Sequence, residues 1–272
     1  MINISIHWYP GHMNKAKNRI YDLVKEVDLV VELRDARIPE SSRNPVLTEI
    51  IKNKPIIVVL NKSDISDDRS NQKWIDWFNK HDRKAILAST KNNKQRHRLL
   101  NDIANYASTF VRKSKITGKP LRVPRILVVG IPNVGKSSFI NFLAGRKSAG
   151  VGAKPGHTRG KQLISVASKL QIVDTPGVLW PKFEDKDVAL KLAATGAIKE
   201  NNFPIDEVLE FILSIIAPDI SWIDYVEDYA KNRGFLMQGS ALDLERAKTV
   251  IYNNFASGSH GKYTLELPNE QE

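Results

Sequence analysis

The sequence has no cysteine among its 272 residues, which excludes disulfide bonds and zinc sites built from thiolates. It also has no apolar run that approaches the roughly 20 residues needed to span a bilayer. Residues 1–7 lack a basic stretch followed by an apolar one, so they do not have the pattern of a secretory signal. We therefore expect a cytoplasmic protein with no membrane partner. Its length allows one sizeable core and a smaller second unit.

Acidic residues are almost missing from one segment, residues 83–125. This segment holds twelve Lys or Arg residues and a single acid, Asp102. The other 29 basic and 29 acidic residues balance, so the whole net charge of +11 resides here. Such a cluster indicates a polyanionic partner, and nucleic acid is favoured over a membrane because no apolar anchor accompanies the charge. The alternative is a solvated basic helix and linker with no partner.

Through the first 200 residues, short apolar runs alternate with segments of helical spacing. The apolar runs predict buried strands at 28–33, 55–60, 85–88 and 124–129. Helical spacing predicts helices at 12–27, 45–51, about 95–112 and 136–144, the first with Ile20, Leu23, Val24 and Val27 on one side. Continuously apolar strands are typical of a mainly parallel sheet covered by helices on both faces. Two further runs, 163–166 and 170–174, predict a hairpin.

The pattern becomes purely helical after about residue 200. Segments 206–216, 222–233 and 241–255 have helical periodicity, and no strand-like run lies between them. We therefore expect an α/β domain at 1–200 and a small all-helical domain at 201–272.

A phosphate-binding loop is predicted at residues 130–137, Gly-Ile-Pro-Asn-Val-Gly-Lys-Ser, between a strand and a helix. Its glycines let backbone N–H groups point at phosphates, and the helix N-terminus adds a favourable dipole. Lys136 is expected to neutralise the β- and γ-phosphates, and Ser137 to ligate Mg²⁺. The residues expected to contact the nucleotide are Asn133, Val134, Gly135, Lys136, Ser137 and Ser138. Taken alone, this pattern also occurs in proteins that bind no nucleotide.

Two further pieces of a nucleotide switch follow this loop. Asp174-Thr175-Pro176-Gly177 begins 38 residues after Lys136. Asp174 can hold Mg²⁺, generally through water, and the N–H of Gly177 can sense the γ-phosphate. Thr158 lies between the two motifs in a Gly-rich stretch, and we expect it to reach Mg²⁺ and the γ-phosphate. Without the phosphate loop, the first of these pieces would be merely a turn.

Asn61-Lys62-Ser63-Asp64 predicts which base is bound. A carboxylate can accept hydrogen bonds from guanine N1–H and its exocyclic amine, a pair that adenine does not offer. We assign Asp64 to that contact, Asn61 to the base edge and the Lys62 stem to stacking over the ring. Ser89, after the next strand, is placed to present a backbone N–H to guanine O6. The alternative, an ordinary helix cap at Asp64, does not explain why the loop ends an apolar strand.

The order of these motifs is unusual, because the guanine loop precedes the phosphate loop along the chain. In ordinary GTP-binding domains the phosphate loop comes first. The sequence therefore predicts a circularly permuted P-loop GTPase domain, followed by the helical domain. Such a permutation would tie the helical domain to the switch, so that loss of the γ-phosphate changes its grip on RNA.

Five motifs together resemble the YlqF/RbgA family of ribosome biogenesis GTPases. They are residues 8–13 (Trp-Tyr-Pro-Gly-His-Met), 35–39 (Asp-Ala-Arg-Ile-Pro), 42–45 (Ser-Arg-Asn-Pro), 130–137 and 179–183 (Leu-Trp-Pro-Lys-Phe). The resemblance covers nearly all of residues 1–200 and is looser afterwards. It implies late assembly of the bacterial large ribosomal subunit, with GTP hydrolysis stimulated by that particle and rRNA binding by the helical domain.

The resemblance also gives roles to two residues. Val178 stands where many GTPases have a glutamine that orients water, so another group must help hydrolysis. In the family that group is the histidine of the Pro-Gly-His-Met motif, which maps to His12; from the sequence alone, a histidine opening a helix is more often a structural cap. Asn133 matches GTPases that use K⁺ as an extra positive charge between the phosphates, so we expect K⁺ dependence; the alternative role for Asn133 is a hydrogen bond inside the loop. One departure is Arg159, where many relatives have a small residue, which leaves Thr158 as the only switch hydroxyl.

Three functions remain in competition at this point. The first is a GTP hydrolase activated on the large-subunit precursor, acting as a monomer with GTP or GDP, Mg²⁺ and K⁺. The second is a GTP-sensing RNA-binding scaffold in which hydrolysis is incidental. The third is a small-subunit or tRNA factor, which is weakened because such permuted GTPases usually carry an added barrel or zinc module.

Overall fold

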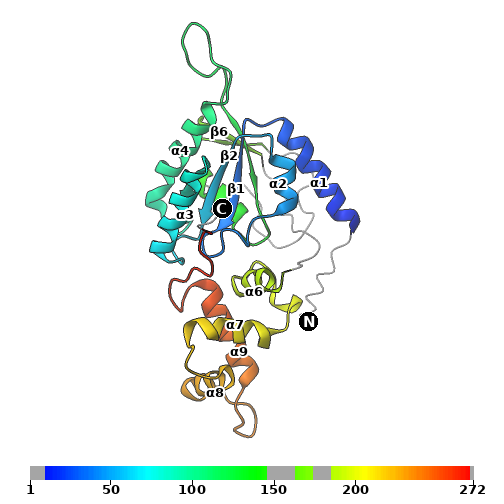
Figure 1. Ribbon diagram of the computed structural model, residues 1–272, viewed down its shortest axis with the longest axis vertical. Helices are drawn as coiled ribbons and strands as arrows, with labels where there is room; N and C mark the ends of the chain where they lie inside the picture. The colour runs from blue at the N-terminus through cyan, green and yellow to red at the C-terminus, as the bar shows by residue number, and fades with distance from the viewer. Residues whose placement is uncertain (1–9, 146–162, 174–184, 270–272) are drawn as a thin grey trace. The chain divides into compact units, whose positions relative to one another are not determined.

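The computed structural model describes residues 10–145, 163–173 and 185–269 (Figure 1). Within these ranges the chain forms two compact units. The α/β unit contains residues 10–173 together with 264–269, and the helical unit contains residues 185–263. The boundary expected at residue 200 therefore falls within the helical unit, after its first helix.

The α/β unit is built on one six-stranded sheet with the order β3-β2-β1-β4-β6-β5. Its strands are β1 (Leu29–Asp35), β2 (Ile56–Asn61), β3 (Lys84–Leu87), β4 (Arg125–Val129), β5 (Leu163–Val166) and β6 (Leu170–Val173). All neighbouring pairs are parallel except β5 and β6. The mainly parallel sheet that the apolar runs predict is therefore confirmed.

The β5–β6 hairpin turns at Ala167 and Ser168, whose φ angles are +46° and +54°. Positive φ at both central residues gives a turn whose twist matches that of the flanking strands. The amide of Lys169 closes the turn by donating to the carbonyl of Val166 at 2.9 Å.

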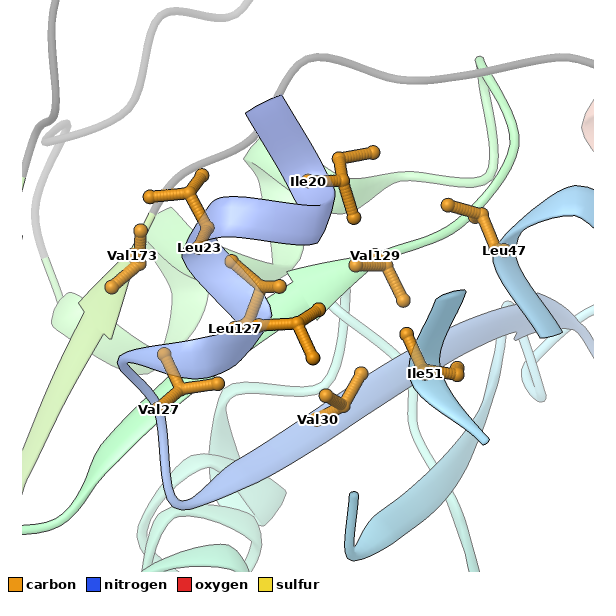
Figure 2. Packing of buried hydrophobic residues seen from close by; sticks show 10 residues of the cluster. Ile20, Leu23, Val27, Val30, Leu47, Ile51, Leu127, Val129 and Val173 are labelled. Carbon is orange, nitrogen blue, oxygen red and sulfur yellow. The ribbon is translucent and has the colours of Figure 1, made fainter. Parts of the chain in front are cut away.

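One face of the sheet is covered by α1 (Pro10–Lys25), α2 (Pro45–Ile51) and α3 (Asp68–Lys80). Figure 2 shows the first two helices packed over the central strands, with buried side chains pointing toward one another. The cluster comprises Ile20, Leu23, Val24, Val27, Val30, Leu47, Ile51, Leu127, Val129 and Val173. Burying each such side chain stabilises the fold by about 1.5–3 kcal/mol. The α1 residues expected to share one side thus do so.

Trp74 and Phe78 of α3 extend this layer over Val58 and Leu60 of β2. The residues of opposite parity, such as Val31, Ile57 and Val128, are fully buried too, so the other face must also be covered. The remaining described helices of the unit, α4 (Arg96–Ser108) and α5 (Lys136–Ala144), provide that cover and present buried faces of their own.

The helical unit contains α6 (Lys186–Ala194), α7 (Ile205–Ile216), α8 (Trp222–Arg233) and α9 (Leu244–Ser257). Short 3₁₀ turns occur at Glu200–Asn202 in this unit and at Asn93–Gln95 in the other. The Tyr252 hydroxyl donates to the Ala193 carbonyl at 3.1 Å, which ties α9 to the end of α6. The buried faces of α7, α8 and α9 supply the small core.

Two predicted helix ends differ from the structure by three residues or more, and one helix was not predicted. Helix α4 ends at Ser108 rather than 112, because the hydroxyls of Ser108 and Thr109 bond to carbonyls of the preceding turn. Helix α9 starts at Leu244 rather than 241, because Asp243 caps it through the amide of Arg246. Helix α6 was not predicted; its cap, Asp185, was the available signal.

Candidate nucleotide-binding site

Four loops of the α/β unit leave the sheet at the same edge. They follow the carboxyl ends of β1, β2, β3 and β4, which are mutually parallel. The chain runs outward from β1 to β3 and then returns to β4 on the other side of β1, so the strand order switches direction between β1 and β4. In open α/β sheets, ligands bind at the carboxyl end of such a switch point.

The loop after β4 has the backbone of a phosphate cradle. Gly130 has a φ of +155°, and a Cβ there would lie 2.5 Å from the carbonyl oxygen of Leu33. Gly135 has a φ of +98°, and a Cβ there would lie 2.6 Å from Nδ2 of Asn61. Both positions therefore require glycine. Asn133, with a φ of +57°, takes the left-handed conformation that asparagine tolerates best after glycine.

Lys136 begins α5 directly after this loop, as the sequence predicts. Its side chain is buried, and Nζ donates to the carbonyl of Ile131 at 2.7 Å, so the ammonium lies over the loop. Ser137 and Ser138 occupy the first turn of α5, where helix N–H groups have no partner within the helix. A cation, backbone N–H groups without acceptors in the helix, and hydroxyls together form a site suited to binding a polyphosphate.

The loop after β2 lies against the phosphate loop. Asn61 is buried, and its Nδ2 donates to the carbonyl of Val134 at 2.9 Å. Its Oδ1 is also buried but has no hydrogen-bond partner among the described residues. Buried polar atoms are nearly always satisfied in folded proteins, so an orphaned acceptor here suits a site that a ligand completes.

Lys62 is held by an ion-pair network that the sequence analysis did not identify. Its Nζ lies 2.9 Å from Oδ2 of Asp35, and Arg37 donates to the same carboxylate from Nε at 3.0 Å and Nη2 at 2.9 Å. Burial alone would raise the pKa of Asp35, but the charges of Arg37 and Lys62 outweigh it and hold that pKa well below its usual range. Burial lowers the pKa of Lys62, and Asp35 opposes that shift. The parallel pairing of β1 and β2, which puts Asp35 opposite Asn61, brings these residues together, and no sequence motif marked that pairing.

Asp64 and Ser89 lie at the end of the site where the sequence predicts base recognition. The amide of Ser63 donates to the carbonyl of Ala88 at 3.1 Å, which joins the loops after β2 and β3. Asp64 is partly exposed and lies 3.5 Å from Nζ of Lys91. Ser89 is buried, and its Oγ accepts from the amide of Lys91. The structure therefore brings Asn61, Lys62, Asp64, Ser89 and residues 130–138 to one edge of the sheet.

Four of the predicted site residues are not placed by this geometry. Thr158, Asp174 and Gly177 lie outside the described residues. His12 lies in the first turn of α1, and its side chain is also outside the described part.

Comparison with known proteins agrees with this architecture. A family model described as 50S ribosome-binding GTPase matches residues 125–234. Ribosome biogenesis GTPase A of Bacillus cereus is 39% identical over 97% of this chain and 95% of its own length. The chain belongs to the ribosome biogenesis GTPase A family. The family member from Thermotoga maritima is 34% identical over 97% of the chain.

Solved structures of the family have the same fold. GNP-bound YlqF from T. maritima superimposes with a TM-score of 0.72 at 30% identity, covering 94% of this chain and 99% of that one. A GDP-bound YlqF structure gives 0.70 at 30% identity, with 92% and 99% covered. This protein is accordingly a circularly permuted GTPase that binds guanine nucleotides, hydrolyses GTP and acts in ribosome assembly. No described helix is long and apolar enough to cross a membrane.

Proposed function

We propose that this GTPase is a cytoplasmic assembly factor that binds the precursor of the large ribosomal subunit through its rRNA. In this proposal the particle stimulates GTP hydrolysis, and hydrolysis switches or releases the protein. The observation that carries the proposal is a cationic surface in the α/β unit, formed by residues 83–125. The names of the family and of its relatives supply the ribosomal context.

The most exposed part of this surface is the basic loop, residues 112–122 between α4 and β4, which projects from its unit in Figure 1. Hydrogen bonds across it give it a defined shape: Ser114 N to Lys119 O at 2.8 Å, and Leu121 N to Arg112 O at 2.9 Å. Ile116 at its tip is 96% exposed. A preformed loop loses little conformational entropy when it binds a partner.

The charges of the basic loop are available to phosphates. Arg112, Lys113, Lys115 and Lys119 are exposed, and none forms an ion pair with a described acid. Arg122, by contrast, is fixed at the base of the loop by Asp28 at 2.7 Å. Four cations around an exposed apolar tip fit RNA, whose unstacked bases offer apolar faces between phosphates.

A shallow cleft of about 560 Å³ lies on the same cationic surface. Lys84, Arg98 and Tyr106 line it, together with Asp102, which lies 3.7 Å from Arg98. An aromatic ring beside cations can stack a base while neighbouring charges hold the backbone. This cleft supports RNA as the partner over a bare solvated helix. We propose that the helical domain expected at 201–272 adds to this RNA contact.

We further propose that Mg²⁺ is held by Ser137 with Thr158 and Asp174, and K⁺ by Asn133. No group of three His, Asp or Glu side chains within the described ranges could hold a metal alone. Mg²⁺ in nucleotide sites keeps several waters and binds substrate phosphates, so it needs few direct protein ligands, and Asp174 would act through water. When bound, the ion neutralises charge that develops on the transferred phosphate. His12 is proposed to assist the attacking water.

GTP turnover in KCl, measured with and without purified large ribosomal subunits, tests the proposal. We expect strong stimulation by the large subunit, none by the small subunit, and slower turnover when NaCl replaces KCl. Equal rates with and without either subunit would favour the scaffold in which hydrolysis is incidental. Stimulation by the small subunit alone would contradict the proposed particle.

A further inference from the structure

The last described segment of the chain packs on the α/β unit, although it follows the helical unit in sequence. We call residues 264–269 the C-terminal latch. Two tryptophans of α3 anchor it: Trp74 Nε1 donates to the Glu266 carbonyl at 3.1 Å, and Trp77 Nε1 donates to the Asn269 carbonyl at 3.2 Å.

The carboxylate of Glu266 is the most heavily bonded group of the latch. Its Oε1 accepts from the amide of Ser41 at 2.8 Å and from the amide of Glu40. Its Oε2 accepts from Ser41 Oγ at 2.6 Å. Hydrogen bonds to an ionised acceptor are roughly twice as strong as neutral ones. Glu266 therefore fixes the loop that follows β1.

That loop is connected to Lys62 by a short chain of contacts. The amide of Leu265 donates to the carbonyl of Arg37 at 2.8 Å. The side chain of Arg37 holds Asp35, and Asp35 holds Lys62, at 2.9 Å in each case. Ser42 braces the same point, because its Oγ accepts from the amide of Asp35 at 3.0 Å.

The latch also contacts the other end of the base-recognition loop. Oγ1 of Thr264 accepts from the amide of Asp67 at 3.1 Å. Asp67 stands three residues after Asp64 and caps α3 through the amide of Ser70 at 2.7 Å. The latch thus contacts two places next to residues 61–64. One is Arg37, which is linked to Lys62 through Asp35, and the other is Asp67, which follows Asp64 by three positions.

We propose that Glu266 is a positioning residue for guanine binding and that the C-terminal latch holds residues 61–64 in their binding conformation. The inference rests on the proposed role of this loop in recognising guanine. The chain continues directly from the helical unit into the latch. A change in the helical unit that released the latch would therefore also change nucleotide affinity.

The test compares GDP with IDP, which lacks the exocyclic amine, as fluorescent analogues in titrations of the full chain. In Glu266→Ala, Asp64 loses its fixed position, so we expect GDP to bind roughly 3- to 10-fold more weakly, with a smaller loss for IDP. The dissociation constant of IDP divided by that of GDP should therefore fall. Glu266→Gln keeps an oxygen acceptor and should recover part of the ratio, which a merely structural role would not predict.

Matched variants separate the possible failures. Glu210→Ala removes an equivalent charge from an exposed position of α7 and should change neither affinity. Thr264→Val tests the second contact if Glu266→Ala folds poorly, and should lower the same ratio. Asp64→Ala should abolish the preference for GDP. If it does so while both latch variants match Glu210→Ala, the latch inference is wrong and the guanine loop stands; if Asp64→Ala has no effect, the proposed role of the loop is wrong.

Discussion

The side-chain amide of Asn61 donates a hydrogen bond of 2.9 Å to the backbone carbonyl of Val134. This contact joins the loop proposed to recognise the base to the loop proposed to bind the phosphates. The two residues are 73 positions apart, and in this permuted chain the base loop comes first. A side-chain contact therefore links the two loops, in addition to the pairing of β2 and β4 with β1.

Asn61→Ala should weaken GDP binding as well as lower stability. The change leaves the buried carbonyl of Val134 without its partner, which costs about 1–3 kcal/mol, or roughly 5- to 150-fold in affinity. Titration with a fluorescent GDP measures the loss. Asn53→Ala, on an exposed turn, is the control and should bind normally. Unchanged GDP binding in Asn61→Ala would mean that the contact does not set the spacing of the loops.

Gly135→Ala and Gly118→Ala should differ although both glycines have positive φ. A Cβ at Gly135 would lie 2.6 Å from Nδ2 of Asn61, whereas a Cβ at Gly118 would meet no atom within 4 Å. We expect Gly118→Ala to cost about 1 kcal/mol from backbone strain alone. Gly135→Ala should lower the stability by more than Gly118→Ala does, and it should abolish nucleotide binding. Denaturant unfolding and GDP titration of both variants check this; equal losses would refute the steric argument.

Asp35→Asn should destabilise the protein at neutral pH, and the effect should shrink only in acid. The pKa of Asp35 is lowered by folding, so its contribution to stability is present above the unfolded value of 3.8 and is lost as the pH falls through the folded value. Breaking a buried ion pair costs about 3–5 kcal/mol. The difference in the free energy of unfolding between Asp35→Asn and wild type should therefore be constant from about pH 8 to pH 5 and become smaller below about pH 4.

Urea unfolding across that pH range measures this difference. The control is Asp22→Asn, whose exposed partner Lys25 lies at 3.2 Å and should contribute at most about 1 kcal/mol. A difference between Asp35→Asn and wild type that narrowed already at pH 6 would show that another group titrates.

Neutralising the basic loop should weaken RNA binding and reduce its salt dependence. For six or more phosphate contacts, wild-type affinity is expected to fall on the order of a thousandfold between about 50 and 200 mM salt. Removing two cations with Lys113→Ala and Lys115→Ala should lower the slope of log K against log salt by about 1.4–1.8. Filter binding to large-subunit rRNA measures both quantities.

The matched control for the basic loop is Lys73→Ala with Lys80→Ala, which removes the same charge from the exposed face of α3. An equal loss of affinity in this control would indicate that only total charge matters. Binding of the wild type to anionic vesicles but not to rRNA would replace RNA with a membrane surface as the partner of the loop.

His12→Ala should slow GTP hydrolysis on the large subunit by about a hundredfold or more without changing GDP affinity. If hydrolysis drives release, the variant should bind the particle and remain on it, as sedimentation would show. His97→Ala, on an exposed turn of α4, is the control. Normal release of His12→Ala would support the scaffold function instead.

The sequence by itself determined the parts of this protein that consist of contiguous residues. The phosphate loop, the guanine loop and the strands that carry them depend on local backbone requirements, such as the positive φ of Gly130 and Gly135. The order of these motifs indicated the permuted topology, and the family comparison agrees. Helices α2, α5 and α8 have the predicted ends because apolar spacing and end signals coincide there.

Only the tertiary structure decided which distant polar groups meet. Asp35 holds Lys62 because adjacent parallel strands bring their ends together, and Glu266 reaches Ser41 across 225 positions. No periodic pattern in the sequence marks either contact. A side-chain hydrogen bond requires two groups to be placed to within a few tenths of an ångström, and apolar spacing does not specify that placement. Periodicity determined the core, and the geometry of the folded chain determined how the site is held.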